Sequence, residues 1–336
     1  MTRCRGALRS SVARMRWVWA ASLLLACGGS SASGSARGTS RTAPAPPDPL
    51  AWMPPGAVTI ARIDVARLSA SPHRDRLASL SATLGMGLSS LPEGVALERL
   101  ARSVLVCGYE DGRIAAIARP GADRESWHAL LGRLGARTSS ENAATTDTVH
   151  RLGDGTVVRW LSPDHVVAGR PQSVLDEVLQ RRRRGAAREI DGVLLEAIGS
   201  SDSADATIAV AWRWPAASSP PHAWGRDFPR GTMRVYVEGA VRLEARAEAS
   251  SEQVAARRLA EARSMLEEVA STPFVALLGL ADAVRAVRVE VSGSTLRVSA
   301  HWDEPTVARL LDQAGLLARA LRSLGDETPA PSTASP

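Results

Sequence analysis

A few short groups of polar side chains in this 336-residue chain have the types and spacing that chemistry requires. His301-Trp302-Asp303-Glu304 places an imidazole beside two carboxylates, as in a metal site or an acid–base pair, and Asp164-His165 is a smaller group of the same kind. A structural role explains both groups as well. Asp303 stands where the N-cap of a following helix is expected, Glu304 suits its first turn, and Asp164 lies in a predicted turn. We favour the structural interpretation and assign no catalytic or metal-binding residue.

Several common enzyme motifs are missing from the sequence. It contains no His-Glu-x-x-His, Cys-x-x-Cys, acidic calcium loop, Gly-x-Ser-x-Gly or Gly-x-Gly-x-x-Gly. All 41 basic residues are arginine, which excludes Schiff-base, P-loop and Ser-x-x-Lys chemistry because each needs a lysine ammonium group. We expect no cofactor. A Ser–His–Asp triad built from distant segments stays open, because spacing along the chain does not reveal it.

Large aromatic side chains gather in one part of the sequence. Aromatic residues make up only 4% of the chain, so a cluster within residues 212–228 is a local anomaly. Its members are Trp212, Trp214, Trp224 and Phe228. They could form a platform that contacts a glycan, a peptide or the membrane interface, or they could fill the core of the second half of the chain.

Two further groups have a functional and a structural interpretation. Arg181-Arg182-Arg183-Arg184 could bind lipid phosphates, or it could end a helix, where cations meet the negative end of the helix dipole. Cys107 lies in a short apolar run that is typical of a buried strand. We expect it to be a small core residue rather than a nucleophile.

The N-terminus has the three parts of an export signal. Residues 1–16 carry five arginines and no acid, and Trp17–Ala26 is apolar but too short to span a bilayer. This stretch ends in Leu24-Leu25-Ala26-Cys27, followed by glycine and serine. The tetrapeptide resembles the lipobox of bacterial lipoproteins, Leu-x-(Ala/Gly)-Cys.

That resemblance implies a covalent lipid anchor. Residues 1–26 would be a signal peptide, cut before Cys27, and Cys27 would carry a diacylglyceryl thioether and an N-acyl chain such as palmitate. Two or more acyl chains give stable membrane attachment. Residue 28 is glycine and not the aspartate that retains such proteins at the inner membrane. The resemblance therefore implies the outer membrane, with the protein facing the periplasm.

The rest of the chain divides by composition. Residues 27–48 would be the lipidated cysteine and a flexible tether rich in small residues and proline, and residues 326–336 a disordered tail of similar composition. Between them, β-branched strands alternate with amphipathic helices, and a hairpin followed by a helix recurs four times. A turn-rich stretch at 199–205 suggests a boundary. The pattern predicts an α+β fold with two domains, 49–200 and 201–325, each an antiparallel sheet with helices on one face.

The charge of the chain does not identify a partner. The formal charge of +6 comes from 41 arginines against 35 acids, but five arginines lie in the predicted signal peptide. The remainder is close to neutral, so we expect no nucleic-acid partner. The body, with Pro54-Pro55, Arg62-Ile-Asp64 and Ser71-Pro72, also resembles uncharacterised lipoproteins of high-GC Gram-negative bacteria, which implies no activity.

The sequence favours a lipid-anchored envelope lipoprotein with a non-enzymatic binding or structural role in the periplasm. Its partners would be the membrane, through the acyl chains, and a periplasmic protein or glycan. Two alternatives stay open. A large apolar cavity would favour a carrier of lipid or another apolar ligand, and a deep cleft with convergent ionisable groups would favour a hydrolase acting on envelope polymers.

Overall fold

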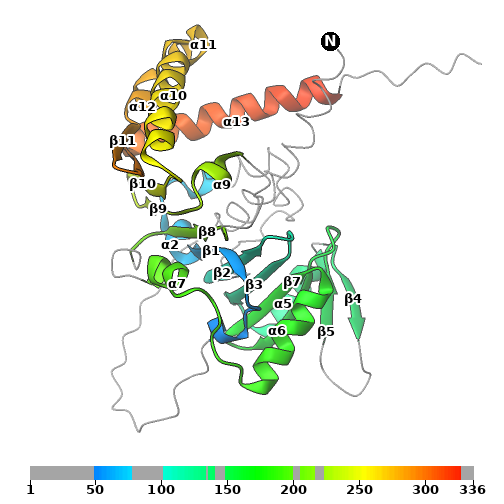
Figure 1. Cartoon of the computed structure of the whole chain (residues 1–336). Coiled ribbons are helices and arrows are strands. Elements are labelled where there is room, and N and C mark those ends of the chain that lie inside the picture. The colour runs from blue at the N-terminus through cyan, green and yellow to red at the C-terminus, as the bar shows by residue number, and fades with distance from the viewer. Residues whose placement is uncertain are drawn as a thin grey trace, which may run out of the picture.

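One large antiparallel sheet dominates the computed structural model of the chain (Figure 1). The model describes residues 49–77, 101–133, 135–140, 148–199, 205–215 and 223–326. The sheet has twelve strands in the order β11-β12-β10-β9-β8-β1-β2-β3-β7-β6-β5-β4. Together with its helices it makes the fold α+β, as predicted. The predicted signal peptide, Cys27 and tether lie outside the described residues, as do residues 327–336.

The strands are short to medium in length. Their bounds are β1 Ala57–Asp64, β2 Ser103–Tyr109, β3 Ile114–Arg119, β4 Arg137–Ser140, β5 Thr148–Arg151, β6 Val157–Ser162, β7 His165–Arg170, β8 Ile208–Arg213, β9 Arg230–Val237, β10 Val241–Glu248, β11 Arg288–Ser292 and β12 Thr295–Trp302. The helices are η1 Pro49–Trp52, α2 Val65–Ala70, α5 Arg124–Arg133, α6 Gln172–Arg184, α7 Gly192–Gly199, α9 Ala223–Asp227, α10 Glu252–Ser271, α11 Pro273–Leu277, α12 Ala281–Arg285 and α13 Glu304–Asp326.

Strand β1 joins the two halves of the sheet. Its Ile60 lies opposite Cys107 of β2 on one side and opposite Ala211 of β8 on the other. Strands from both sides of the predicted boundary at 199–205 therefore belong to one sheet. The division into two domains stays a prediction.

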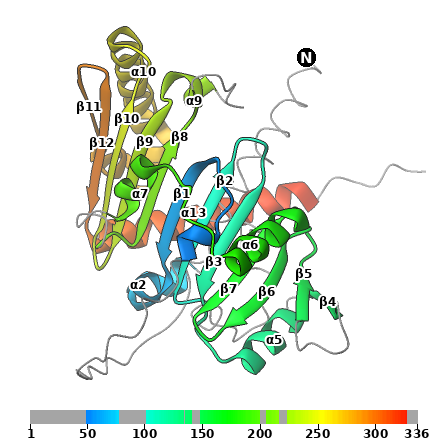
Figure 2. The ribbon, with the colours of Figure 1, turned by 60° about the horizontal axis from the view of Figure 1, so that its bottom comes forward.

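Each face of the sheet has its own helices. On one face, α6 and α7 pack on Ile60, Cys107 and Val167, together with η1. On the other face, α5 packs on Trp160, and α10 packs on Leu296. Figure 2 shows α6 and α7 in front of the sheet and α10 behind it. The expectation that helices cover a single face was wrong for the first half of the chain, because strands β6 and β7 are apolar on both sides: Val167 faces α6, while Val166 faces α5.

The predicted hairpin-then-helix units are all present. They are β2–β3–α5, β6–β7–α6, β9–β10–α10 and β11–β12–α13. Local signals explain the turns and helix starts. Gly112 turns the first hairpin with φ of 83°, which favours glycine, and Ser251 caps α10 by accepting the Val254 N–H. Asp303 caps α13 by accepting the Thr306 N–H at 3.0 Å, as predicted.

Two segments add to or differ from the sequence pattern. A short helix that the pattern did not predict, α2, begins at Val65, because Asp64 accepts the Arg67 N–H and caps it. The helix expected from Ser71-Pro72 follows it: Ser71 Oγ accepts the His73 N–H and residues 74–77 are helical, while residues 78–84 lie outside the described residues. A strand was expected from Arg285, but Arg285 is the last residue of α12, and β11 begins at Arg288.

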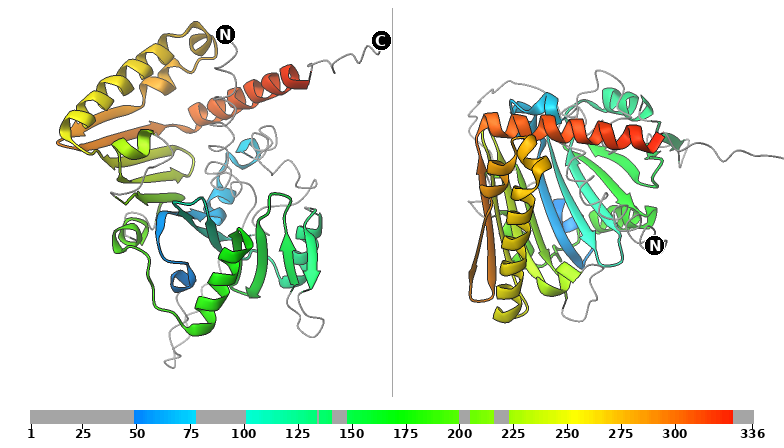
Figure 3. Two further views of the ribbon diagram at one scale, coloured as in Figure 1. Left: turned by 45° about the vertical axis from the view of Figure 1, so that its right-hand side comes forward. Right: turned by 90° about the horizontal axis from the view of Figure 1, so that it is seen from above.

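The last helix leaves the sheet. Figure 3 shows α13 running from the end of β12 toward the opposite end of the molecule. Val307 is buried at its start, and Asp312 accepts a hydrogen bond from Arg76 at 3.1 Å. No helix among the described residues is both long enough and apolar enough to cross a membrane.

Candidate ligand-binding sites

An open cleft lies where η1 meets strands β1, β2 and β3. We call it the η1 cleft. Its volume of about 660 Å³ is within the range of small-molecule sites. The sheet register places two rows of side chains along it. Leu105 stands between Arg62 and Ile117, and Ser103 stands between Asp64 and Arg119.

Leu105 and Ile117 of the first row give the cleft an apolar floor, and the second row gives it a polar edge. Leu50 and Pro49, at the start of the described chain, add apolar surface from the opposite wall. A ligand with an apolar part and a charged end fits this division better than a uniformly polar one.

The charged groups of the cleft are not equally engaged. Asp64 accepts the Arg67 N–H at 2.9 Å and lies 3.5 Å from the Arg67 guanidinium, so its charge already supports α2. Burial lowers the pKa of Arg62, an effect that the neighbouring Asp64 opposes. Arg119 is exposed, and its side chain makes no hydrogen bond or ion pair among the described residues. Arg119 can therefore be approached by an anion.

His165 forms one end of the cleft. Its ring lies edge-on to Trp52, with the centroids 5.0 Å apart, and the Arg182 guanidinium lies over the Trp52 ring, 5.2 Å from its centroid. Burial is the main cause that lowers the pKa of His165; Asp164 opposes it, and Arg182 and Arg119 add to it. The imidazole is therefore neutral at neutral pH and can donate or accept one hydrogen bond at each nitrogen.

Comparison with known proteins gives no family. No protein-family model and no curated protein matches the chain. Two crystal structures of a protein named TP0453 are similar in arrangement. Crystal form I has a TM-score of 0.48 with 11% identity, over 81% of this chain and 99% of that one. Crystal form IV also has a TM-score of 0.48, with 10% identity over 81% and 98%.

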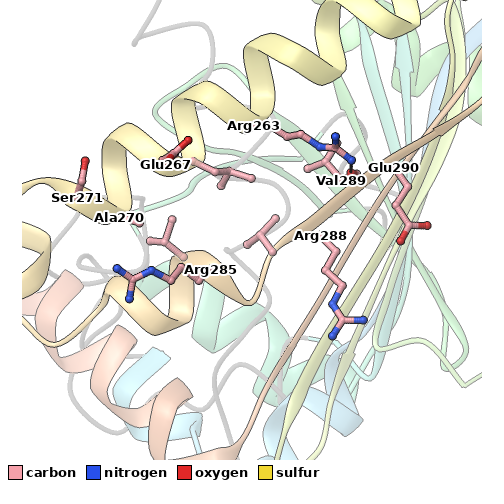
Figure 4. A pocket seen from close by; sticks show the side chains of 11 residues that line it. Arg263, Glu267, Ala270, Ser271, Arg285, Arg288, Val289 and Glu290 are labelled. Atoms are coloured by element: carbon pink, nitrogen blue, oxygen red, sulfur yellow. Dashed lines mark hydrogen bonds between the residues drawn. The ribbon is translucent and has the colours of Figure 1, made fainter.

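A second open groove, the α10 groove, lies between α10, α12 and β11 (Figure 4). Its volume is about 620 Å³. Apolar side chains, among them Leu266, Val284 and Val287, line its middle. At its rim, an Arg263 Nη donates to the Val289 carbonyl oxygen at 3.3 Å and so covers part of the edge of β11.

The predicted aromatic cluster is largely structural. Phe228 is 1% exposed and belongs to the core under α10. Trp212 is half-buried against the same core, and its Nε1 donates to the Phe228 carbonyl oxygen at 3.1 Å. Trp214 lies one residue beyond β8 and is half-buried, and the side chain of Trp224 lies outside the described residues. Phe228 is therefore a core residue rather than part of an exposed platform, and a role of Trp214 and Trp224 in contacting a partner stays a prediction.

The other candidate groups have structural roles. Arg181, in the last turn of α6, donates hydrogen bonds to Glu189 at 3.1 Å and to the Ala51 carbonyl oxygen. Arg182 lies over the Trp52 ring, so two of the four arginines contact neighbouring segments. Cys107 is fully buried, and burial raises the pKa of its thiol to about 12, as expected for a core cysteine. Among the described residues, no three His, Cys, Asp or Glu side chains are grouped to hold a metal.

One polar pair was missed in the sequence. His128 Nδ1 and His150 Nε2 are 2.5 Å apart, and both rings lie edge-on to Trp127. No pattern in the sequence indicated this pair, because its members lie on α5 and on β5, and the polar composition of β5 did not predict a strand. Burial is the main cause that lowers the pKa of each histidine, and for His150 the neighbouring His128 adds to the effect.

Proposed function

We propose that this protein is a lipid-anchored lipoprotein of the cell envelope with a non-enzymatic binding role in the periplasm. The observation that carries the proposal is the sequence Leu24-Leu25-Ala26-Cys27, at the end of a short apolar stretch behind an arginine-rich, acid-free start. Acyl chains on Cys27 would hold the body at a membrane, and the outer membrane is the proposed location.

The η1 cleft is the proposed ligand site. Its wall begins at Pro49, directly after the proposed tether, so the site would lie at the root of the anchor. Arg119 would bind a carboxylate or phosphate, while Leu105 and Ile117 would contact the apolar part of the ligand. A periplasmic protein or a glycan with such a group is the partner that we propose.

Labelling in living cells tests the anchor. We expect wild-type protein to incorporate labelled palmitate and to sediment with outer membranes. Once its signal peptide has been removed, Cys27→Ser should neither incorporate palmitate nor sediment with membranes. A wild-type protein without label, together with a Cys27→Ser variant that stays in the membrane fraction as before, would contradict the proposal.

A carrier role is the second candidate, and the apolar middle of the α10 groove favours it. Leu266→Asp should then abolish binding of a fluorescent fatty acid. Met265→Asp is the matched control, because Met265 is the residue of α10 that precedes Leu266 and is 60% exposed. Equal binding by both variants, with unfolding midpoints like that of the wild type, would rule out the groove as the carrier site.

The hydrolase alternative has less support. Several ionisable groups line the η1 cleft, yet no described histidine ring is hydrogen-bonded to a carboxylate. His165 Nδ1 instead lies 3.3 Å from Ser162 Oγ, which also accepts the Asp164 N–H and so belongs to the turn between β6 and β7.

A further inference from the structure

Strands β10 to β12 have one covered face and one open face, and the neighbouring strand β9 is mostly half-buried on the open side. Val289, Leu296 and Ala247 point to α10 and are buried. The alternate residues of β10, β11 and β12 point the other way and are mostly exposed. In Figure 4, Val289 points toward α10, while Arg288 extends away from it. Among the described helices, those with several contacts to β9–β12 lie on the covered side.

The open face is rich in arginine. The register of β9–β12 places six arginines and three glutamates on it, an excess of three positive charges. We call this surface the arginine face; its charged members are Arg230, Arg234, Arg242, Arg246, Arg288, Arg297, Glu244, Glu248 and Glu290. After residue 26 the whole chain has 36 arginines against 35 acids, so positive charge is concentrated here.

The glutamates do not neutralise the whole surface. Glu248 pairs with Arg230, and Glu244 lies 3.4 Å from Arg242, whose guanidinium also stacks on a tyrosine ring. Arg246 and Arg297, by contrast, make no ion pair or hydrogen bond with their side chains among the described residues.

Arg246 and Arg297 also stand directly opposite each other on β10 and β12. Cβ atoms of such a pair are about 5 Å apart, and like charges in this position destabilise a sheet. An anion between the two guanidinium groups would relieve the repulsion, and a phosphate accepts hydrogen bonds from two arginines at once. Glu290 of β11 stands opposite Arg297 on its other side and offsets part of this repulsion, and a phosphate bound by both arginines would offset the rest.

The shape of the surface indicates the source of that phosphate. Four strands spaced by about 4.8 Å present guanidinium groups over a width of about 14 Å on an open, pleated plane. Such a plane matches an extended layer of charges better than it encloses a single small ion. We propose that the arginine face binds the phosphate layer of an anionic lipid membrane. This surface is separate from the η1 cleft. The proposal rests on the proposed lipid anchor in one respect only, because the anchor would keep the body of the protein close to a membrane.

Vesicle binding without the anchor tests the proposal. The chain from residue 28 onward contains every described helix and strand and lacks both the signal and Cys27. We expect it to sediment with vesicles of phosphatidylglycerol and phosphatidylcholine and not to bind vesicles of pure phosphatidylcholine. It should dissociate from the anionic vesicles as the salt concentration increases. Arg246→Gln and Arg297→Gln should each weaken binding about fivefold, and the double variant about 25-fold.

Controls separate charge from folding. Arg133→Gln removes an exposed arginine at the end of α5, away from the arginine face, and should change binding little. The double variant should unfold at about the same urea concentration as the wild type, because it loses both a like-charge pair and the arginine opposite Glu290. Equal binding to neutral and anionic vesicles, or wild-type affinity in the double variant, would overturn the proposal.

A soluble competitor identifies the phosphate source. If the same arginines bind glycerol phosphate saturably at micromolar concentration, the ligand of the face is a small phosphate ester. If the protein binds DNA more tightly than vesicles, the ligand is a nucleic acid. Either result overturns a membrane role. Palmitate labelling of wild-type protein is independent of all these outcomes, so failure of the anchor and failure of the arginine face can be told apart.

Discussion

Replacing Gly231 by alanine should destabilise the protein by an amount that the structure predicts. Gly231 lies on β9 opposite Trp212 of β8, and the indole ring occupies the space that a side chain would need. A Cβ at this position would lie 2.3 Å from Trp212 Cζ2 and 2.5 Å from the Arg246 carbonyl oxygen. Both distances are far below van der Waals contact, and the second obstacle is backbone that cannot rotate away.

The magnitude follows from two losses. Overpacking of this kind typically costs about 1–3 kcal/mol. Displacing the ring would also break the hydrogen bond from Trp212 Nε1 to the Phe228 carbonyl oxygen, which contributes about 1 kcal/mol. We therefore expect Gly231→Ala to lower the free energy of unfolding by about 2–4 kcal/mol.

Urea unfolding followed by tryptophan fluorescence measures this change. Gly132→Ala is the matched control, because Gly132 lies inside α5 with open space around it and should gain up to about 1 kcal/mol from alanine. In a Trp212→Ala background, Gly231→Ala should cost less, because one of its two obstacles is gone. A Gly231→Ala protein as stable as the wild type would refute the reasoning, and an unchanged cost without the indole would show that the ring is not the obstacle.

Three further predictions concern buried polar groups. Burial lowers the pKa of His150, so below about pH 6.5 the unfolded chain binds a proton that the folded protein does not. The free energy of unfolding should therefore be highest above that pH and fall below it by up to about 1.4 kcal/mol per pH unit. In His150→Gln, the urea midpoint should depend less steeply on pH. Tyr109→Phe removes a buried hydroxyl that donates to the Pro54 carbonyl oxygen at 3.0 Å, and calorimetry should report a loss of about 1 kcal/mol. Cys107 should resist a maleimide in the native state and react fully in urea, because it is buried and its thiol pKa is raised to about 12; rapid native labelling would contradict its burial.

Local structure was the part of the fold that the sequence predicted best. Asp123 and Ser251 each accept a backbone N–H at the start of a helix, and Gly112 turns a hairpin, so signals of a few residues were sufficient. The hydrophobic pattern of β6 and β7 was less informative. Val166 and Val167 are both buried, on opposite faces, and such a run does not reveal that helices lie on both sides.

The candidate sites depend on contacts between distant segments. The η1 cleft needs Arg62, Arg119 and His165 to meet from three strands, and the pair of Arg246 and Arg297 exists only because β10 lies beside β12. Neither arrangement can be inferred from the spacing of residues along the chain. The aromatic cluster was detectable in composition, but burial, which composition does not give, decided the role of Phe228.

The position of β1 in the sheet has a consequence for synthesis and truncation. Ile63 pairs with Ile208, so one edge of β1 stays without its partner until more than half of the chain has emerged. An apolar strand with an open edge is a template for pairing with other chains. A nascent or shortened protein that ends near residue 199 would therefore be prone to aggregate, and it would depend on a chaperone to keep β1 covered until β8 arrives.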